Sequence, residues 1–269
     1  MTLSNPMPRN DVAASGRILS ALVAVSLFAA LWLPLGQHEF LVPHWMKVGT
    51  FAAPFLLMGY TTSPSNRPRL SDPHFASILL LVAYIAHQFE EHWVDLLGNK
   101  YAFFAYVNTL VRGAIGTDDL SVAPLTPMGI FVINTSLVWL VGVIAILRAR
   151  THWFPVFAMA AIALVNGVTH VIGGIVTFAY NPGLLTSVLL FLPLPVLFYR
   201  KVLRENPALL LPVIASLIWA VLAHILMVGG MLAANLFGVM PESLYFAALV
   251  VWSLMPLGLF RSLSRNSGS

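Results

Sequence analysis

Long apolar runs separated by short polar connections dominate this chain, and they restrict it to one class of protein. A helix that spans a bilayer needs about 20 predominantly apolar residues, and the core of a soluble domain does not require several such runs. Hydrophobic residues make up 59% of the chain and charged residues only 9%, which excludes a soluble enzyme. The sequence therefore predicts an all-α fold, a polytopic transmembrane helix bundle.

Eight apolar segments are interpreted as membrane spans. They cover residues 17–36, 43–60, 75–97, 125–147, 154–178, 184–199, 208–236 and 243–260. The first segment could instead be a signal peptide, because Arg9 and Arg17 precede it. Its length and the lack of a clear small-residue cleavage site favour an uncleaved span. We expect residues 1–269 to form a single integral membrane domain.

The basic residues indicate how these spans are oriented. Of the 14 Lys and Arg residues, 11 fall at the start, at alternate connections and at the end of the chain, on one side of the membrane. The other side has only Lys47, Lys100 and Arg112. By the positive-inside rule, both termini are predicted to be cytoplasmic. Because the basic residues form no continuous stripe, we expect no nucleic-acid partner.

The third apolar segment carries a group of ionisable residues in its predicted outer half. An Asp or a basic residue at the centre of a membrane helix costs about 2.5–3.5 kcal/mol, so such a group needs partners or a wet cavity. His87, Glu91 and Asp95 follow one another at intervals of four residues and share a helical stripe, with Glu90 within reach of His87. His92 is predicted to point away from this stripe. For His92 and Asp95, a location in the outer headgroup region is as well supported as a role in the site.

Two further spans bring polar side chains to a similar depth. Asn166 and His170 lie one turn apart in the fifth span, and His224 lies in the seventh. Spans three, five and seven are predicted to run in the same direction, so a rise of about 1.5 Å per residue puts His87 about 18 Å from the inner end. His170, His224 and Glu91 come out at about 24 Å. The three histidines and the carboxylate are therefore expected at one level, in the outer half of the bilayer.

Other features of the predicted outer side have plainer interpretations. Residues 98–124 form the one long connection and are expected to contain an interfacial helix or a cap. Asn134 of the fourth span falls about 14 Å from the outer end and could join the polar level. Tyr180-Asn-Pro-Gly183 is interpreted as a turn after the fifth span. Trp45 lies near a predicted span end, as an aromatic belt anchor does.

Imidazoles and carboxylates from different helices commonly form metal sites in helical bundles. The expected ligands are His87, Glu91, His170 and His224. Because the chain has no cysteine, this set suits zinc, iron or manganese, and no organic cofactor is predicted. The expected catalytic residues are Glu90, Glu91 and Asn166. A second glutamate could take a proton from metal-bound water, which would support hydrolysis.

The leading hypothesis is a membrane-embedded, metal-dependent enzyme on a lipid-like or other apolar substrate, with hydrolysis slightly favoured over oxidation. The spacing matches neither HEXXH nor the Glu-x-x-His pairs of di-iron bundles. The same residues allow a metal-free isomerase or cyclase that uses Glu and His as acid and base. They also allow a small proton-coupled transporter. The metal hypothesis needs all three histidines, whereas acid-base chemistry could survive the loss of His224.

The run His87-Gln-Phe-Glu-Glu91 matches the signature of the HXXEE-domain family of bacterial integral membrane proteins. Asn166-Gly-Val-Thr-His170 and Tyr180-Asn-Pro-Gly183, followed by Thr186, resemble later blocks of that family. The resemblance covers about residues 75–200 and leaves residues 201–269 as two additional spans and a cytoplasmic tail. It implies a multi-pass protein of the bacterial inner membrane, of uncharacterised function. The residues that carry over are His87, Glu90, Glu91, Asn166 and His170, whereas His224 does not.

Overall fold

The computed structural model describes residues 41–61 and 69–260 of the chain. Within these ranges the chain is helical, and the one β interaction is an isolated antiparallel bridge between Val94 and Lys100. The predicted all-α class is therefore confirmed for the described residues. The first predicted span, residues 17–36, lies outside them.

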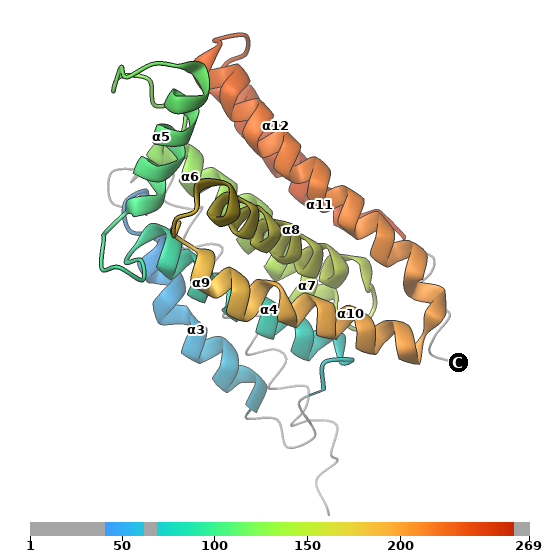
Figure 1. The fold of residues 1–269 in the computed structure, drawn as a ribbon. Helices are drawn as coiled ribbons and strands as arrows, with labels where there is room; N and C mark the ends of the chain where they lie inside the picture. Colours follow the sequence, from blue (N-terminus) through green and yellow to red (C-terminus); the bar gives the residue numbers. More distant parts are fainter. Residues whose placement is uncertain (1–40, 62–68, 261–269) are drawn as a thin grey trace, which may run out of the picture.

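The first helices follow the predicted segments closely (Figure 1). The second segment forms α3 (Trp45–Thr61) and the third forms α4 (Pro73–His92). The fourth forms α6 (Pro127–Ile133), the π-helical stretch η1 (Asn134–Leu140) and α7 (Val141–Arg148). The fifth forms α8 (Phe154–Thr177). Two helices begin with the same local chemistry, because Asp72 before Pro73 and Thr126 before Pro127 each accept a hydrogen bond from a backbone N–H of the first turn.

The remaining helices also correspond to predicted segments. The sixth segment forms α9 (Leu184–Thr186), the π-helical η2 (Ser187–Phe191) and α10 (Pro193–Glu205). The seventh forms the short η3 (Pro207–Leu209), α11 (Leu210–Met231) and the π-helical η4 (Leu232–Leu236). The eighth forms α12 (Glu242–Leu254) and η5 (Met255–Leu257). Helix α10 ends at Glu205, beyond the end of the sixth predicted segment at residue 199.

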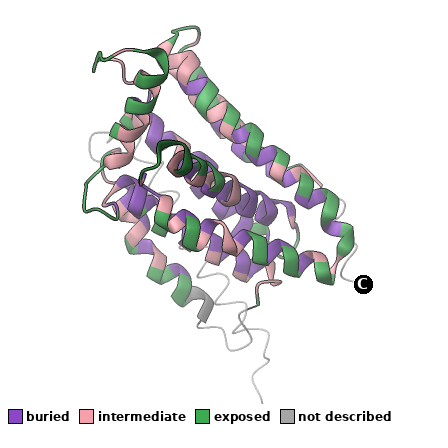
Figure 2. Cartoon of the chain, in the orientation of Figure 1, coloured by how far each residue is buried: buried purple, intermediate pink, exposed green. Residues whose placement is uncertain are grey.

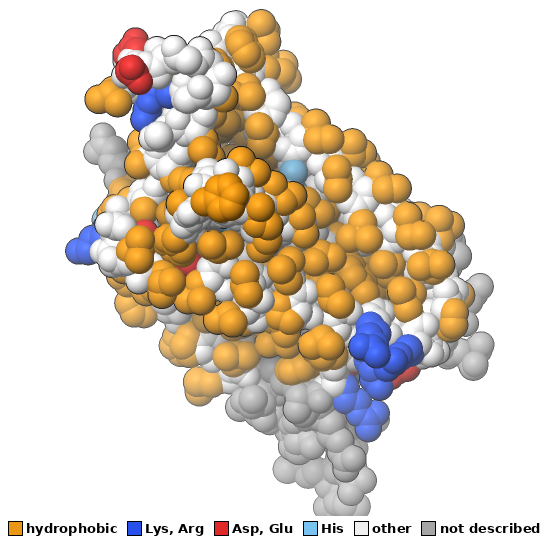
Figure 3. Space-filling model, viewed as in Figure 1, with side chains coloured by type: hydrophobic (Ala, Val, Ile, Leu, Met, Phe, Trp, Pro, Cys, Tyr) orange, Lys and Arg blue, Asp and Glu red, His pale blue; other side chains and the backbone are white. Residues whose placement is uncertain are grey.

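Four of the described helices are long and apolar enough to cross a membrane. They are Pro127–Arg148, Phe154–Thr177, Leu184–Glu205 and Pro207–Leu236. Hydrophobic side chains cover most of the face in Figure 3, and Lys and Arg gather near the end of α10. This supports association with a membrane, while eight spans and cytoplasmic termini stay predictions.

Helix α8 lies inside the bundle, packed against α4, α7, α10 and α11 (Figure 1). All side chains of its first ten residues, Phe154–Ala163, are buried. Figure 2 shows this buried core continuing through α7 and α4. The second half of α8 is different, because several of its side chains reach the surface, including Thr169 and Ile172. Most of the α8 residues that line the cavity described below belong to this second half.

The long connection contains α5 (Ala102–Ile115), which agrees with the predicted interfacial helix or cap. It lies beside the second half of α8 in Figure 1. Asn108 fixes it to the start of α6, because its side chain donates to the carbonyl of Leu125 at 3.0 Å and accepts from the Leu125 N–H at 2.9 Å. Its aromatic side chains Phe103 and Tyr106 border the cavity described below.

Two predictions near the end of α4 are wrong. The helix ends at His92 rather than at residue 97, because Asp95 turns the chain by accepting the N–H groups of Leu97 at 2.9 Å and Asn99 at 2.7 Å. Asp95 therefore belongs to this turn and not to the stripe of His87 and Glu91. Trp45 is not a belt anchor, since only 1% of it is exposed and its ring packs 5.3 Å from that of His92.

Candidate metal site

Three imidazoles surround the carboxylate of Glu91 in the interior of the bundle. Oε1 lies 3.0 Å from Nε2 of His170. Oε2 lies 3.3 Å from Nε2 of His87 and 3.2 Å from Nε2 of His92. All four residues are buried. The predicted helical stripe brings His87 and Glu91 together on α4, and α8 adds His170.

Nδ1 of His87, the ring nitrogen that faces away from Glu91, is hydrogen-bonded to Thr186 at the end of α9. The Thr186 hydroxyl donates to Oε2 of Glu90 at 2.5 Å, so its oxygen accepts a hydrogen bond from Nδ1 of His87 at 2.8 Å. This assigns the imidazole proton to Nδ1. The other nitrogen, Nε2, then has a lone pair, which accepts from the Asn166 amide at 3.1 Å and faces Glu91.

His170 has the same arrangement with a different partner. The Asn181 amide donates to the backbone carbonyl of His170 at 2.9 Å, which fixes its orientation. Its Oδ1 therefore accepts from Nδ1 of His170 at 2.7 Å. As in His87, a proton is assigned to Nδ1, and Nε2 faces Glu91, where it can carry a second proton or bind a metal ion. Asn181 is a site residue that sequence analysis treated as part of a turn.

His92 was predicted to point away from the stripe, and this is wrong. Its Nε2 accepts from the Asn134 amide at 3.3 Å and lies beside Glu91. The same amide donates to the Ile130 carbonyl at 2.9 Å, and its oxygen accepts from Gln88 at 3.0 Å, which fixes the orientation. Asn134 thus joins the polar level, as its predicted depth allowed. It begins a π-helical stretch, a feature found frequently at functional sites.

Three imidazole nitrogens and a carboxylate therefore converge, and an approach this close requires positive charge among them. A metal cation or shared protons would provide that charge. Ligand atoms of His87, Glu91 and His170 all lie within 4.8 Å of one another, so these three buried residues could hold a metal ion. Each of the two histidines also has an outer partner of the kind that orients metal-ligating imidazoles.

Glu90 is adjacent to Glu91 in sequence but has different surroundings. Its carboxylate accepts from the Tyr180 hydroxyl at 2.9 Å and from the N–H groups of Leu185 at 3.0 Å and Thr186 at 2.8 Å, besides the Thr186 hydroxyl. Burial, together with the neighbouring carboxylate, raises the pKa of Tyr180, which keeps its hydroxyl a donor. This arrangement favours a positioning role, since Glu90 fixes the segment that orients His87.

The turn after α8, Tyr180-Asn-Pro-Gly183, covers one side of this cluster and is called the roof turn. Gly183 has a left-handed backbone with φ of 94°. A Cβ atom added there would lie 2.7 Å from Cε1 of His87 and 2.8 Å from both Cγ of Glu91 and Cε1 of His170. Tyr180-Asn-Pro-Gly183 is therefore a turn, as predicted, and also a wall of the site. The missing side chain of Gly183 is what lets three ligand candidates approach one another under the turn.

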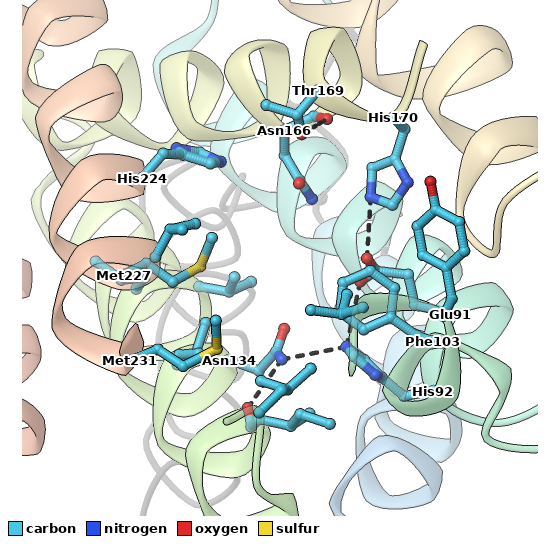
Figure 4. Close-up of a pocket in the computed structure, with 18 of the residues that line it drawn as sticks. Glu91, His92, Phe103, Asn134, Asn166, Thr169, His170, His224, Met227 and Met231 are labelled. Carbon is cyan, nitrogen blue, oxygen red and sulfur yellow. Dashed lines mark hydrogen bonds and ion pairs between the residues drawn. The ribbon is translucent and has the colours of Figure 1, made fainter. Parts of the chain in front are cut away.

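A cavity of about 350 Å³ adjoins the cluster on one side (Figure 4). It is lined by side chains of α4, α5, α6, η1, α8 and α11, most of them apolar. Glu91, His92 and His170 reach it, whereas His87 and Glu90 do not line it. Figure 4 shows His224 projecting from α11 on the opposite side, near Asn166. The structure thus puts His224 at the same cavity but outside the group of ligand atoms around Glu91.

Residues 78–198 match the model of a family described as a protein of unknown function with HXXEE motif. This confirms the predicted resemblance. The matched segment runs from α4 into α10 and contains the motif, Asn166, His170 and the roof turn, but not His224. No curated protein and no solved structure matches the chain.

Proposed function

We propose that the protein is a membrane-embedded, metal-dependent enzyme that acts on a lipid-like or other apolar substrate. The proposal is supported by the convergence of three imidazole nitrogens on one buried carboxylate. The partners at Nδ1 of His87 and His170 hold this arrangement in place. His87, Glu91 and His170 would bind the ion, and the cavity beside them would hold the substrate.

Two histidines and one glutamate suit zinc, with a position left open for water or substrate, and equally suit the non-haem iron of oxygenases. His92 favours hydrolysis over oxidation. Its Nε2 lies 3.2 Å from Glu91 and it lines the cavity, so a proton acceptor stands beside the candidate ligands. Because Glu90 already accepts four hydrogen bonds, we assign to His92 the base role predicted for Glu90.

The residues would divide the work of hydrolysing an ester or a similar bond as follows. When bound, the ion supplies Lewis acidity that polarises the scissile carbonyl group and acidifies water. His92 takes a proton from the attacking water at Nε2, where the water replaces the Asn134 N–H, as the new C–O bond forms. It returns this proton to the leaving oxygen as the old bond breaks. Asn166, released from Nε2 of His87 when that lone pair binds the ion, donates its N–H to the carbonyl oxygen.

Elemental analysis of the purified full-length protein tests the metal. We expect about one equivalent of zinc, iron or manganese per chain, lost in His170→Gln and Glu91→Gln. Glu205→Gln is the matched control, since Glu205 is exposed and pairs with Lys201 at 3.1 Å far from the cluster. Absence of metal from the wild type, with none taken up on reconstitution, would overturn the proposal.

Isotope labelling tests the reaction. Protein in nanodiscs of native lipid is incubated in ¹⁸O-labelled water, and the lipid extract is analysed by mass spectrometry. Hydrolysis transfers the label into a product with the wild type and not with Glu91→Gln. Metal-dependent turnover in which a product gains unlabelled oxygen from O₂ would instead indicate oxidation.

A metal-free acid-base enzyme is the second candidate, because a proton shared between Glu91 and Nε2 of His170, 3.0 Å apart, also supplies positive charge among these groups. Deuterium from solvent entering a product that has gained no oxygen would support it. A proton path has less support. The first half of α8 between the cluster and the other end of the bundle, Phe154–Ala163, offers only apolar side chains.

A further inference from the structure

We infer that the cavity between α5, α8 and α11 binds an uncharged single-chain amphiphile whose polar end carries a hydroxyl or amide N–H, and that His224 accepts this hydrogen bond. This inference names the substrate class of the proposed enzyme and rests on that proposal. It makes His224 a substrate-positioning residue rather than the metal ligand expected from the sequence.

The cavity wall is suited to a hydrocarbon chain. On α11 it presents Met227, Val228 and Met231, and on α5 it presents Val107 and Leu110. Its volume of about 350 Å³ is at the lower end of the range for small-molecule sites. One apolar chain with a small polar end suits this space better than a branched lipid with a large headgroup.

Charge excludes an anionic headgroup. Among the described residues no Lys or Arg lines the cavity, although these are the side chains that usually bind phosphate or carboxylate. The N–H groups of Leu185 and Thr186, at the start of α9, already donate to Glu90. If a divalent ion binds, Glu90 and Glu91 already balance its charge. A buried anionic end would therefore lack a counter-charge, which is costly.

His224 supplies an acceptor on the wall facing the cluster. Its Nδ1 donates to the backbone carbonyl of Ala220 at 2.8 Å, so its Nε2 has the lone pair. The side chain lines the cavity and is directed across it from α11 (Figure 4). A lone-pair acceptor on an otherwise apolar wall selects a ligand with a hydrogen-bond donor over one without.

The cavity has a side opening through which a chain could reach lipid. Leu110, Thr169 and Val228 line the cavity and are also exposed on the surface, from α5, α8 and α11 respectively. α8 and α11 are candidate spans, so exposed apolar side chains there would face lipid chains. An amphiphile could therefore enter sideways with its polar end towards the cluster and its tail in the opening.

Competition binding to the full-length protein in nanodiscs tests the inference without turnover. Labelled hexadecanol is displaced by unlabelled hexadecanol, hexadecyl methyl ether or hexadecyl phosphate, which share one chain and differ in the end group. We expect the ether and the phosphate each to compete at least about 10-fold more weakly than the alcohol, the size of one hydrogen bond. Equal or tighter competition by the phosphate would overturn the inference.

Variants of His224 test its role. His224→Leu should abolish the preference for alcohol over ether and leave ether binding intact, and His224→Gln, which retains an acceptor, should restore part of it. Ether binding reports that the cavity is folded, and His44→Leu, outside the cavity lining, is the control. A preference unchanged in His224→Leu would contradict the inference. Metal content is measured on the same samples. A protein that binds metal but does not prefer the alcohol refutes this inference alone. A protein that prefers the alcohol but binds no metal refutes the metal proposal alone.

Discussion

Among Gly→Ala substitutions at the described glycines, we expect Gly183→Ala to damage the site most. The substitution acts in two ways. A left-handed backbone costs an L-residue about 1–2 kcal/mol, and the φ of Gly183 is 94°. The new Cβ would also lie 2.7–2.8 Å from atoms of His87, Glu91 and His170, so these buried side chains must move. Overpacking of this kind costs about 1–3 kcal/mol.

The expected loss of unfolding free energy is therefore about 2–5 kcal/mol, the sum of strain and crowding. Two other glycines separate these causes. Gly116 also has a positive φ, 69°, but nothing lies within 4 Å of a Cβ there, so Gly116→Ala tests strain alone. Gly229 on α11 has open space and a helical backbone, and Gly229→Ala should be neutral or stabilising.

Denaturant unfolding in detergent measures the stability of the three variants, and elemental analysis measures their metal content. We expect Gly183→Ala alone to lose metal, since its methyl group separates the candidate ligands. Gly183→Ala and Gly116→Ala equally destabilised, with metal retained in both, would refute the view that the turn is a wall of the site.

Three further substitutions distinguish the roles of neighbouring residues. Glu90→Gln should lower the unfolding free energy by about 2–3 kcal/mol, because the amide cannot accept all four donors around it; stability unchanged from Glu205→Gln would contradict the positioning role. His92→Gln should retain metal but reduce turnover by at least about 100-fold, and lost metal would show that His92 is a ligand. Asn181→Leu should weaken metal binding about 10- to 100-fold, measured by chelator competition, because it removes the acceptor for Nδ1 of His170; unchanged affinity would argue against that role.

Helical spacing and depth predicted the centre of the site correctly. The interval of four residues between His87 and Glu91 fixes their contact within one helix, so no tertiary information was needed. The proximity of His170 was predicted from its equal depth in a second span predicted to run in the same direction, and its contact with Glu91 agrees with that prediction. Depth, however, gives only the position of a side chain along the membrane normal, and not its position in the plane of the membrane. His224 accordingly reaches the same cavity without joining the other imidazoles.

The remaining contacts could not be predicted from the sequence. They depend on loops, which have no hydrophobic periodicity, and on the rotation of neighbouring helices about their axes. His92 was misplaced because its neighbours Asn134 and Trp45 come from other helices, whose rotation about their axes the hydrophobic pattern leaves open. Asn181 and Gly183 looked like ordinary turn residues, since Asn, Pro and Gly occur in turns for their backbone properties alone. Two signals were available: the turn directly follows the span that carries His170, and Tyr180-Asn-Pro-Gly183 resembles a block of the HXXEE family.

The hydrogen bonds of Glu90 join segments that the ribosome makes at different times. Thr186, which donates two of them, follows Glu90 by 96 residues. At about 5–20 residues per second, the ribosome needs roughly 5–20 s to make that stretch. During this interval the newly made α4 carries Glu90, Glu91, His87 and His92 without the partners from η1, α8 and α9 that later surround them. In the predicted topology α4 is the third span, and unpaired ionisable side chains oppose its retention in lipid. We therefore expect its stable insertion to follow the synthesis of residues 180–186, and chains truncated before the roof turn to be released or degraded.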